Sequence, residues 1–166
     1  FVPAELRLLA YADQPLPIAH GQTISQPYIV AYMTQVLDLS SGERVLEVGT
    51  GSGYQAAVLA ELVDDVYTIE IIPALARRAE QALRDTGYDG VQCREGDGYY
   101  GWPEAAPFDA IIVTAAATSV PPPLVEQLAP GGRMIVPVGD TAWSQNLVLV
   151  TKSEDGDVRT RVMLPV

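Results

Sequence analysis

Three glycines directly follow a short apolar run, and this stretch constrains the chain more than any other. Gly49, Gly51 and Gly53 come immediately after the run Val45–Val48, and a helical pattern begins at Tyr54. That order predicts a strand, a tight turn and a helix, the first unit of an open parallel α/β sheet. Glycine allows positive φ and close approach of a ligand, and a helix N-terminus presents free N–H groups. The stretch therefore predicts a small-molecule site at the carboxyl end of the first strand.

The spacing of these glycines bears on which ligand binds. The dinucleotide pattern G-x-G-x-x-G fails when it starts at Gly49, because residue 54 is Tyr, and from Gly51 it needs Ala56 as its last member. A G-x-G-x-G loop directly after a strand suits a nucleoside without a pyrophosphate. Glu70 ends a second apolar run roughly twenty residues later, where an acidic side chain can bind a ribose diol. Both NAD and S-adenosylmethionine carry that diol, so Glu70 alone does not distinguish them.

Charge and composition exclude several classes of function. The 166 residues include 10 Lys and Arg against 21 Asp and Glu, a net charge of −11, which disfavours nucleic acid as a partner. One Cys and one His provide neither an internal disulfide nor a His-based metal site or triad. No apolar run is long enough to span a membrane, and no signal peptide is visible. We expect a single domain over residues 1–166, cytoplasmic and monomeric, without a metal.

Apolar periodicity along the rest of the chain predicts alternating helices and strands. Helices are expected near residues 27–38, 54–62 and 73–87, with a short one ending at 130–132, and strands near 66–70, 91–94, 108–114, 133–138, 146–152 and 158–164. Ser25 is placed to cap the first helix. The last two runs flank an Asp-Gly turn, which favours an antiparallel hairpin. The expected fold class is α/β: a doubly wound Rossmann-like open sheet, mostly parallel with an antiparallel C-terminal strand, and helices on both faces.

Several of these stretches also resemble known families. Five stretches resemble the class I S-adenosylmethionine-dependent methyltransferases in order and spacing: Val45–Gly53, Glu70, Gly96–Gly98, Phe108–Thr114 and Leu128–Gly132. Pro15–Pro27 and Asp109–Ala116 resemble the protein-L-isoaspartate O-methyltransferase family, and Gln-Thr-Ile-Ser-Gln-Pro just upstream of a glycine loop is specific to it. The resemblance covers nearly the whole chain. The N-terminal helices of that family are expected to be absent here.

The resemblance implies a reaction and the residues that carry it. The reaction is methyl transfer from S-adenosyl-L-methionine, leaving S-adenosyl-L-homocysteine, to the free α-carboxylate of L-isoaspartyl residues in damaged proteins and peptides. The methyl ester then starts repair through a succinimide. Ser25 matches the residue with the active-site role. We expect it to orient the acceptor rather than attack, because an α-carboxylate with a pKa near ~3.5 is already ionised at pH 7.

The predicted site has one catalytic residue, Ser25, and a set of cofactor-binding residues: Gln22, Thr23, Ile24, Glu47, Gly49, Gly51, Gly53, Glu70, Ile71, Asp97 and Gly98. Asp97 matches the family acid that pairs with the adenine amino group, and Gly98 lets the ring approach. Glu47 either contacts the methionine end of the cofactor or is satisfied by loop amides. Loop N–H groups near Ala115–Ala117 are expected to help hold the acceptor. Two alternatives stay open: a class I methyltransferase with a different acceptor, and a non-catalytic cofactor-binding fragment.

Overall fold

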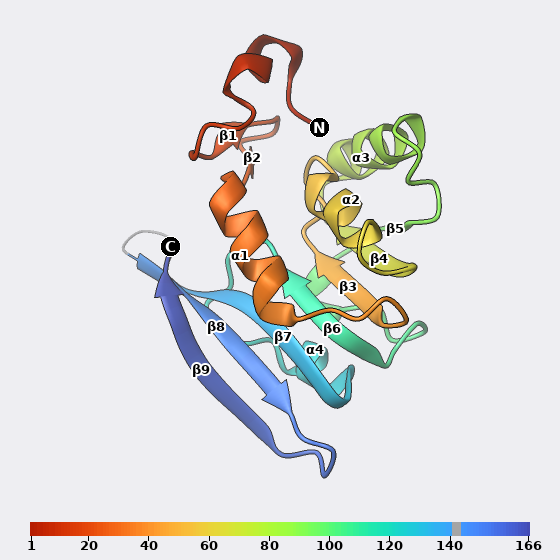
Figure 1. Cartoon of the computed structure of the whole chain (residues 1–166), viewed down its shortest axis with the longest axis vertical. Coiled ribbons are helices and arrows are strands. Elements are labelled where there is room, and N and C mark those ends of the chain that lie inside the picture. The colour runs from red at the N-terminus through yellow and green to blue at the C-terminus, as the bar shows by residue number, and fades with distance from the viewer. Residues whose placement is uncertain (141–143) are drawn as a thin grey trace.

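A seven-stranded sheet forms the centre of the computed structural model, which describes residues 1–140 and 144–166 (Figure 1). The strand order is β5-β4-β3-β6-β7-β8-β9. The first five strands in this order pair in parallel, whereas β7–β8 and β8–β9 pair antiparallel. The expected parallel sheet with an antiparallel end is confirmed. The strands are β3 Arg44–Val48, β4 Asp65–Glu70, β5 Gln92–Glu95, β6 Phe108–Val113, β7 Leu128–Asp140, β8 Ser144–Lys152 and β9 Val158–Pro165.

Helices cover both faces of this sheet, as expected. On one face lie α1 (Pro27–Leu37), α2 (Tyr54–Ala60) and α3 (Pro73–Asp85), and on the other lies α4 (Pro122–Glu126) (Figure 1). The alternation of side chains along a strand explains the two layers. Val45 packs with the α1 and α2 side chains, whereas its neighbour Leu46 packs with Leu124 of α4. The central strand β3 is therefore buried on both sides.

The N-terminal segment forms short elements above the ends of the central strands. A 3₁₀ helix, η1, spans Ala4–Leu9, and the two-residue strands β1 (Leu16–Pro17) and β2 (Thr23–Ile24) pair antiparallel. This small hairpin holds residues 22–25 beside the N-terminus of α1 (Figure 1). Across the described ranges, no helix has the length and apolar character needed to cross a membrane.

The expected cap of α1 is wrong. Helix α1 begins at Pro27 and its N-cap is Gln26, whose side chain makes no capping hydrogen bond; the first-turn N–H of Tyr28 donates instead to Asp13 Oδ1 at 3.2 Å. A local capping side chain belongs to the N-cap, the residue directly before the helix. Ser25 lies one residue too early, so its hydroxyl is not engaged by the helix.

The expected short helix after the proline triplet is present as α4, but its expected end at 130–132 is wrong. Helix α4 ends at Glu126, and residues 128–132 already belong to β7. The Phe108 N–H donates to the Gln127 carbonyl at 2.8 Å, and Phe108 pairs with Leu128 before a register shift. Long-range pairing to β6 thus converts the Pro-Gly-Gly sequence into an irregular strand rather than a helix end. The shift leaves β7 still aligned with β6 over residues 133–135.

Candidate functional site

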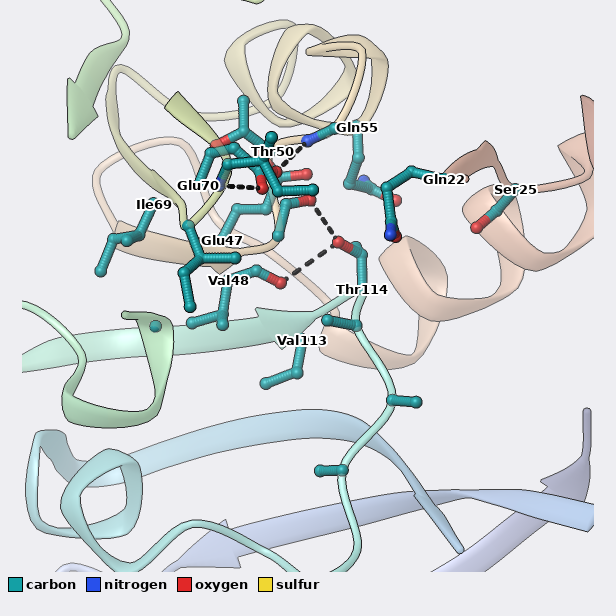
Figure 2. A pocket seen from close by; sticks show the side chains of 18 of the residues that line it. Gln22, Ser25, Glu47, Val48, Thr50, Gln55, Ile69, Glu70, Val113 and Thr114 are labelled. Carbon is teal, nitrogen blue, oxygen red and sulfur yellow. Dashed lines mark hydrogen bonds between the residues drawn. The ribbon is translucent and has the colours of Figure 1, made fainter. Parts of the chain in front are cut away.

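A cavity of about 490 Å³ opens at the carboxyl ends of β3, β4 and β6. This size falls within the range of small-molecule sites, roughly 300–1,000 Å³, and its position is where ligands bind in open parallel sheets. Its walls come from segments far apart in sequence, shown as sticks in Figure 2. They are residues 22–25, 29–30, 33, 47–52, 54–55, 69–72, 97–99, 113–119, 121 and 124.

The glycine loop forms one wall of the cavity. Gly49, Gly51 and Gly53 have φ of +102°, +55° and +88°, which residues with a Cβ rarely adopt. A Cβ on Gly49 would lie 2.7 Å from Thr114 Oγ1, so β6 packs directly against the loop. Gly53 differs from the other two: it is the N-cap of α2, does not line the cavity, and faces Leu83 of α3. The structure therefore places Gly49 and Gly51 at the cavity and Gly53 against α3.

Glu70 links the glycine loop to the end of β4. Its Oε2 accepts a hydrogen bond from the Gly51 N–H at 2.8 Å, and its Oε1 accepts one from the Ile72 N–H at 3.0 Å. The side chain is almost fully buried at the cavity wall. Each carboxylate oxygen keeps further acceptor capacity. Glu70 is thus fixed in place with lone pairs available to a vicinal diol, and the neighbouring Ile71 is exposed along the same rim.

Glu47 lines the cavity from inside β3 and is completely buried. Its Oε2 accepts a hydrogen bond from the Thr68 hydroxyl at 2.6 Å. Its Oε1 is the buried side-chain oxygen that lacks a partner among residues 1–140 and 144–166. The expectation that loop amides could satisfy Glu47 is therefore wrong. Burial raises the pKa of the Glu47 carboxyl to about 8, with a further increase from the charge of Glu70.

Asp97 and Gly98 form the opposite rim of the cavity, after β5. Asp97 Oδ1 accepts a hydrogen bond from the Tyr99 N–H at 2.9 Å and caps a short 3₁₀ helix, η2 (Gly98–Tyr100). Gly98 is buried, and a Cβ there would overlap Val48 Cγ1. The backbone at Gly98 thus packs directly against Val48 of β3 and leaves no room for a side chain. Tyr99 is about half exposed and lines the same rim.

Residues 22–25 form the wall next to α1, facing the glycine loop. Gln22, Thr23, Ile24 and Ser25 all line the cavity. The position of a Cβ on Gly51 lies 3.6 Å from Ile18 Cδ1, so the β1–β2 hairpin contacts the loop directly. Figure 2 shows Ser25 at the edge of the cavity, beyond Gln22. The segment singled out by its sequence and the glycine loop thus face one another across a single cavity.

Gln55 and Thr114 are among the cavity-lining residues that the sequence reasoning did not assign to the site. Gln55, in the first turn of α2, is buried and donates from Nε2 to Thr34 Oγ1 of α1 at 3.0 Å. Thr114 follows β6 and donates from Oγ1 to the Gly49 carbonyl (Figure 2). A polar residue directly after a buried strand is the signal that identified Glu70, and the same signal was available for Thr114. Gln55 carried no comparable signal, because its burial depends on α1.

Comparison with known sequences gives one consistent result. The family model "Protein-L-isoaspartate(D-aspartate) O-methyltransferase (PCMT)" matches residues 1–166. A protein-L-isoaspartate O-methyltransferase 1 from Nitrosospira multiformis is 63% identical over the whole of this chain, which covers 70% of that protein. A protein-L-isoaspartate O-methyltransferase 2 from Syntrophobacter fumaroxidans is also 63% identical, with 67% of its length covered.

Solved structures agree with the sequence comparison. A protein-L-isoaspartate O-methyltransferase structure superposes with a TM-score of 0.83 at 32% identity, covering 94% of this chain and 51% of that one. A Plasmodium falciparum protein assigned as a protein-L-isoaspartate O-methyltransferase, in complex with S-adenosyl-L-homocysteine, gives a TM-score of 0.76 at 26% identity. That superposition covers 94% of this chain and 78% of the Plasmodium falciparum protein. This chain thus spans about half the length of the first structure.

Proposed function

This chain belongs to the protein-L-isoaspartate(D-aspartate) O-methyltransferase family, and we propose that its cavity transfers a methyl group from S-adenosyl-L-methionine to the free α-carboxylate of an L-isoaspartyl residue. The acceptor is a damaged protein or peptide. The observation that carries the proposal is that residues 22–25 and the glycine loop line one cavity. A cofactor loop alone would serve many methyltransferases, whereas the upstream segment is specific to this family.

The cavity fits S-adenosyl-L-methionine on three observations. Its volume of about 490 Å³ suits a nucleoside with a side chain. The buried Glu70 carboxylate, held by two backbone N–H groups, retains acceptor capacity for ribose hydroxyls. The unpartnered Glu47 Oε1 provides an acceptor or an acid inside the same cavity. A ligand with a diol at one end and a positive charge at the other matches this set of groups.

The residues fall into three groups along the cavity. We assign Glu70 and Ile71 to the ribose, and Asp97 with Gly98 to the adenine. The methionyl end is assigned to Gly49, Gly51, Glu47 and the segment Gln22–Ile24. When bound, S-adenosyl-L-methionine supplies a methyl group on a sulfonium, which an oxygen anion displaces.

The protein's own contribution is to orient and to exclude water. An α-carboxylate has a pKa near ~3.5 and is a nucleophile at neutral pH without a base. The sole histidine, His20, does not line the cavity, so the proposal requires nothing of it. Correct alignment of two reactants can account for a large part of a displacement barrier. The chain therefore has to place the carboxylate, and the later closure to a succinimide requires no residue of the enzyme.

Ser25 and the loop segment 115–119 after β6 are the groups assigned to the acceptor. The Ser25 hydroxyl has no hydrogen-bond partner in the described part of the chain, and it borders the cavity. Across from it, residues 115–119 line the cavity, and the Ala117 N–H donates to the Pro137 carbonyl. That contact and an isolated bridge between Ala117 and Val138 hold Ala117 beside β7. We propose that Ser25 donates one hydrogen bond to the acceptor carboxylate while the 115–119 backbone holds the peptide.

The wider setting follows from charge and composition. We propose that residues 1–166 act as one domain, as a cytoplasmic monomer. The net charge of −11 opposes binding to nucleic acid, and the single thiol, Cys93, cannot form an internal disulfide. Light scattering during size-exclusion chromatography tests the monomer directly.

The decisive assay uses two peptides that differ only in an isoaspartyl or an aspartyl linkage. With methyl-labelled S-adenosyl-L-methionine, we expect base-labile label on the isoaspartyl peptide alone. Label on both peptides would favour a class I methyltransferase with a different acceptor. Cofactor binding with label on neither would favour a non-catalytic fragment.

A further inference from the structure

The Glu47 carboxyl is placed unusually for an acidic side chain. Glu47 pairs with Thr68 of β4 on one side and with Ile112 of β6 on the other, so it lies on a central strand of the sheet. The side chain is fully buried, yet it borders the cavity. Oε2 accepts a hydrogen bond from Thr68, and Oε1 has no partner among the residues that the structure describes. A buried charge in this position would lack a counter-charge.

The groups around Glu47 disfavour its ionised form. One contact opposes this: the Thr68 hydroxyl donates its single proton to Glu47 and by itself lowers the pKa of that carboxyl, so Thr50 donates in the 2.6 Å contact between the two threonines. On β4, Glu70 adds a negative charge, and on β5 the neighbouring titratable group is the Cys93 thiol. On β6, Ile112 is apolar, and on α1 and α2 the buried polar groups Thr34 and Gln55 are uncharged. Burial, the largest cause, raises the pKa of Glu47 to about 8.

We propose that Glu47 holds a proton in the ligand-free protein and releases it to solvent when a cationic ligand enters the cavity. The ligand charge then replaces the missing counter-charge, because a nearby positive charge favours the carboxylate. This inference rests on the proposed function, since it takes S-adenosyl-L-methionine as the cation. S-adenosyl-L-homocysteine keeps the ammonium group but lacks the sulfonium charge, so it replaces less of the missing counter-charge and Glu47 releases less of its proton beside the product. Glu47 thereby makes the cavity favour the methyl donor over the spent product.

The sign of the pH dependence follows from this exchange. Below pH 8 the proton must leave before the carboxylate–cation pair forms, so affinity for S-adenosyl-L-methionine rises with pH, by up to about tenfold per pH unit. Above pH 8 the carboxyl is already ionised and the dependence disappears. Affinity for S-adenosyl-L-homocysteine gains less over the same range. The ratio of the two dissociation constants is therefore expected to grow between pH 6 and pH 8.

Proton release can be measured directly by titration calorimetry at pH 7 in two buffers of different ionisation enthalpy. The proteins are wild type, Glu47→Gln, and Glu126→Gln as a control on an exposed carboxyl. With a pKa of about 8, wild type and Glu126→Gln should release up to nine-tenths of a proton more than Glu47→Gln on binding S-adenosyl-L-methionine. Protons exchanged by the ligand's own amino group are common to all three proteins and cancel. Equal release from wild type and Glu47→Gln would overturn the inference.

A second measurement requires no variant that has to fold. Infrared difference spectra of wild type should show loss of a protonated-carboxyl band on adding S-adenosyl-L-methionine, and a smaller loss with S-adenosyl-L-homocysteine. An unchanged band contradicts the inference even if Glu47→Gln is unstable. Binding without Glu47-dependent proton release overturns this inference alone. Absence of any binding overturns the proposed function together with it.

Discussion

The Thr114 hydroxyl donates a hydrogen bond to the Gly49 carbonyl at 2.5 Å (Figure 2). The Thr114 Oγ1 atom would also lie only 2.7 Å from a Cβ added to Gly49. The contact joins the carboxyl end of β6 to the first glycine of the loop after β3. It shows that the left-handed backbone at Gly49 and the absence of a side chain are required together. The loop therefore owes its shape to a neighbouring strand as well as to its own sequence.

Gly49→Ala should distort the loop and weaken cofactor binding. Alanine at φ +102° is strained, and its methyl group would collide with Thr114, so we expect a loss of about 1–3 kcal/mol of stability. S-adenosyl-L-methionine affinity should fall at least tenfold in titration calorimetry. Gly42→Ala is the matched control, because a Cβ there meets nothing within 4 Å, and it should stay within about 0.5 kcal/mol. Equal effects at both glycines would refute the role of Thr114 contact.

Glu70→Gln should reduce cofactor affinity while leaving the fold intact. The amide has only one acceptor oxygen, so either the Gly51 N–H or the Ile72 N–H faces a donor. Losing hydrogen bonds to a charged acceptor corresponds to roughly 10- to 100-fold in the dissociation constant. Glu95→Gln, at the Cα partner position on β5, serves as control and should bind normally. A normal dissociation constant for Glu70→Gln would remove Glu70 from the ribose assignment.

Ser25→Ala should lower turnover without changing cofactor affinity. The hydroxyl neither caps α1 nor bonds another described residue, so its loss leaves the local structure in place. Removing one donor to a carboxylate predicts a fall of about 10- to 100-fold in kcat on the isoaspartyl peptide. Ser41→Ala, in the exposed turn before β3, should retain full activity. If Ser25→Ala instead weakened S-adenosyl-L-methionine binding, the residue would belong to the cofactor subsite.

Glu43→Gln should remove part of the acid sensitivity of the fold. Arg133 donates to both Glu43 oxygens at 2.6 and 2.8 Å and to the Leu37 and Asp38 carbonyls at the end of α1. The Arg133 hydrogen bond holds the pKa of the Glu43 carboxyl below its usual value near 4.5. Because the folded-state pKa is lowered, the ion pair stabilises the fold above pH 4.5, and this stability is lost as the pH falls through the folded-state pKa.

We therefore expect Glu43→Gln to cost about 2 kcal/mol at pH 7 and less as the pH approaches 3, measured by urea unfolding. Glu80→Gln breaks an exposed ion pair within α3 and should change stability by less than about 0.5 kcal/mol at either pH. A constant penalty for Glu43→Gln across this range would mean that the ion pair is not the source of the pH dependence.

The sequence alone determined the parts of this protein that depend on local physics. The strand, glycine turn and helix of residues 45–60 follow from apolar periodicity and from the φ values that only glycine adopts readily. Glu70 could be placed at the cavity because parallel strands end at a common edge. The family followed from short motifs whose order the fold preserves.

The tertiary structure decided whatever depends on contacts between distant segments. Pairing with β6 drew residues 128–132 into β7, and helix packing turned Gly53 toward α3 instead of the cavity. The start of α1 at Pro27 left Ser25 without a capping role. No local pattern predicts that Glu47 would keep one oxygen unpartnered, because that depends on Thr68, on Ile112 and on the absence of a nearby cation among residues 1–140 and 144–166. Burial and hydrogen-bond partners are properties of the packed chain, so the chemistry of Glu47 could be assigned only once the sheet had formed.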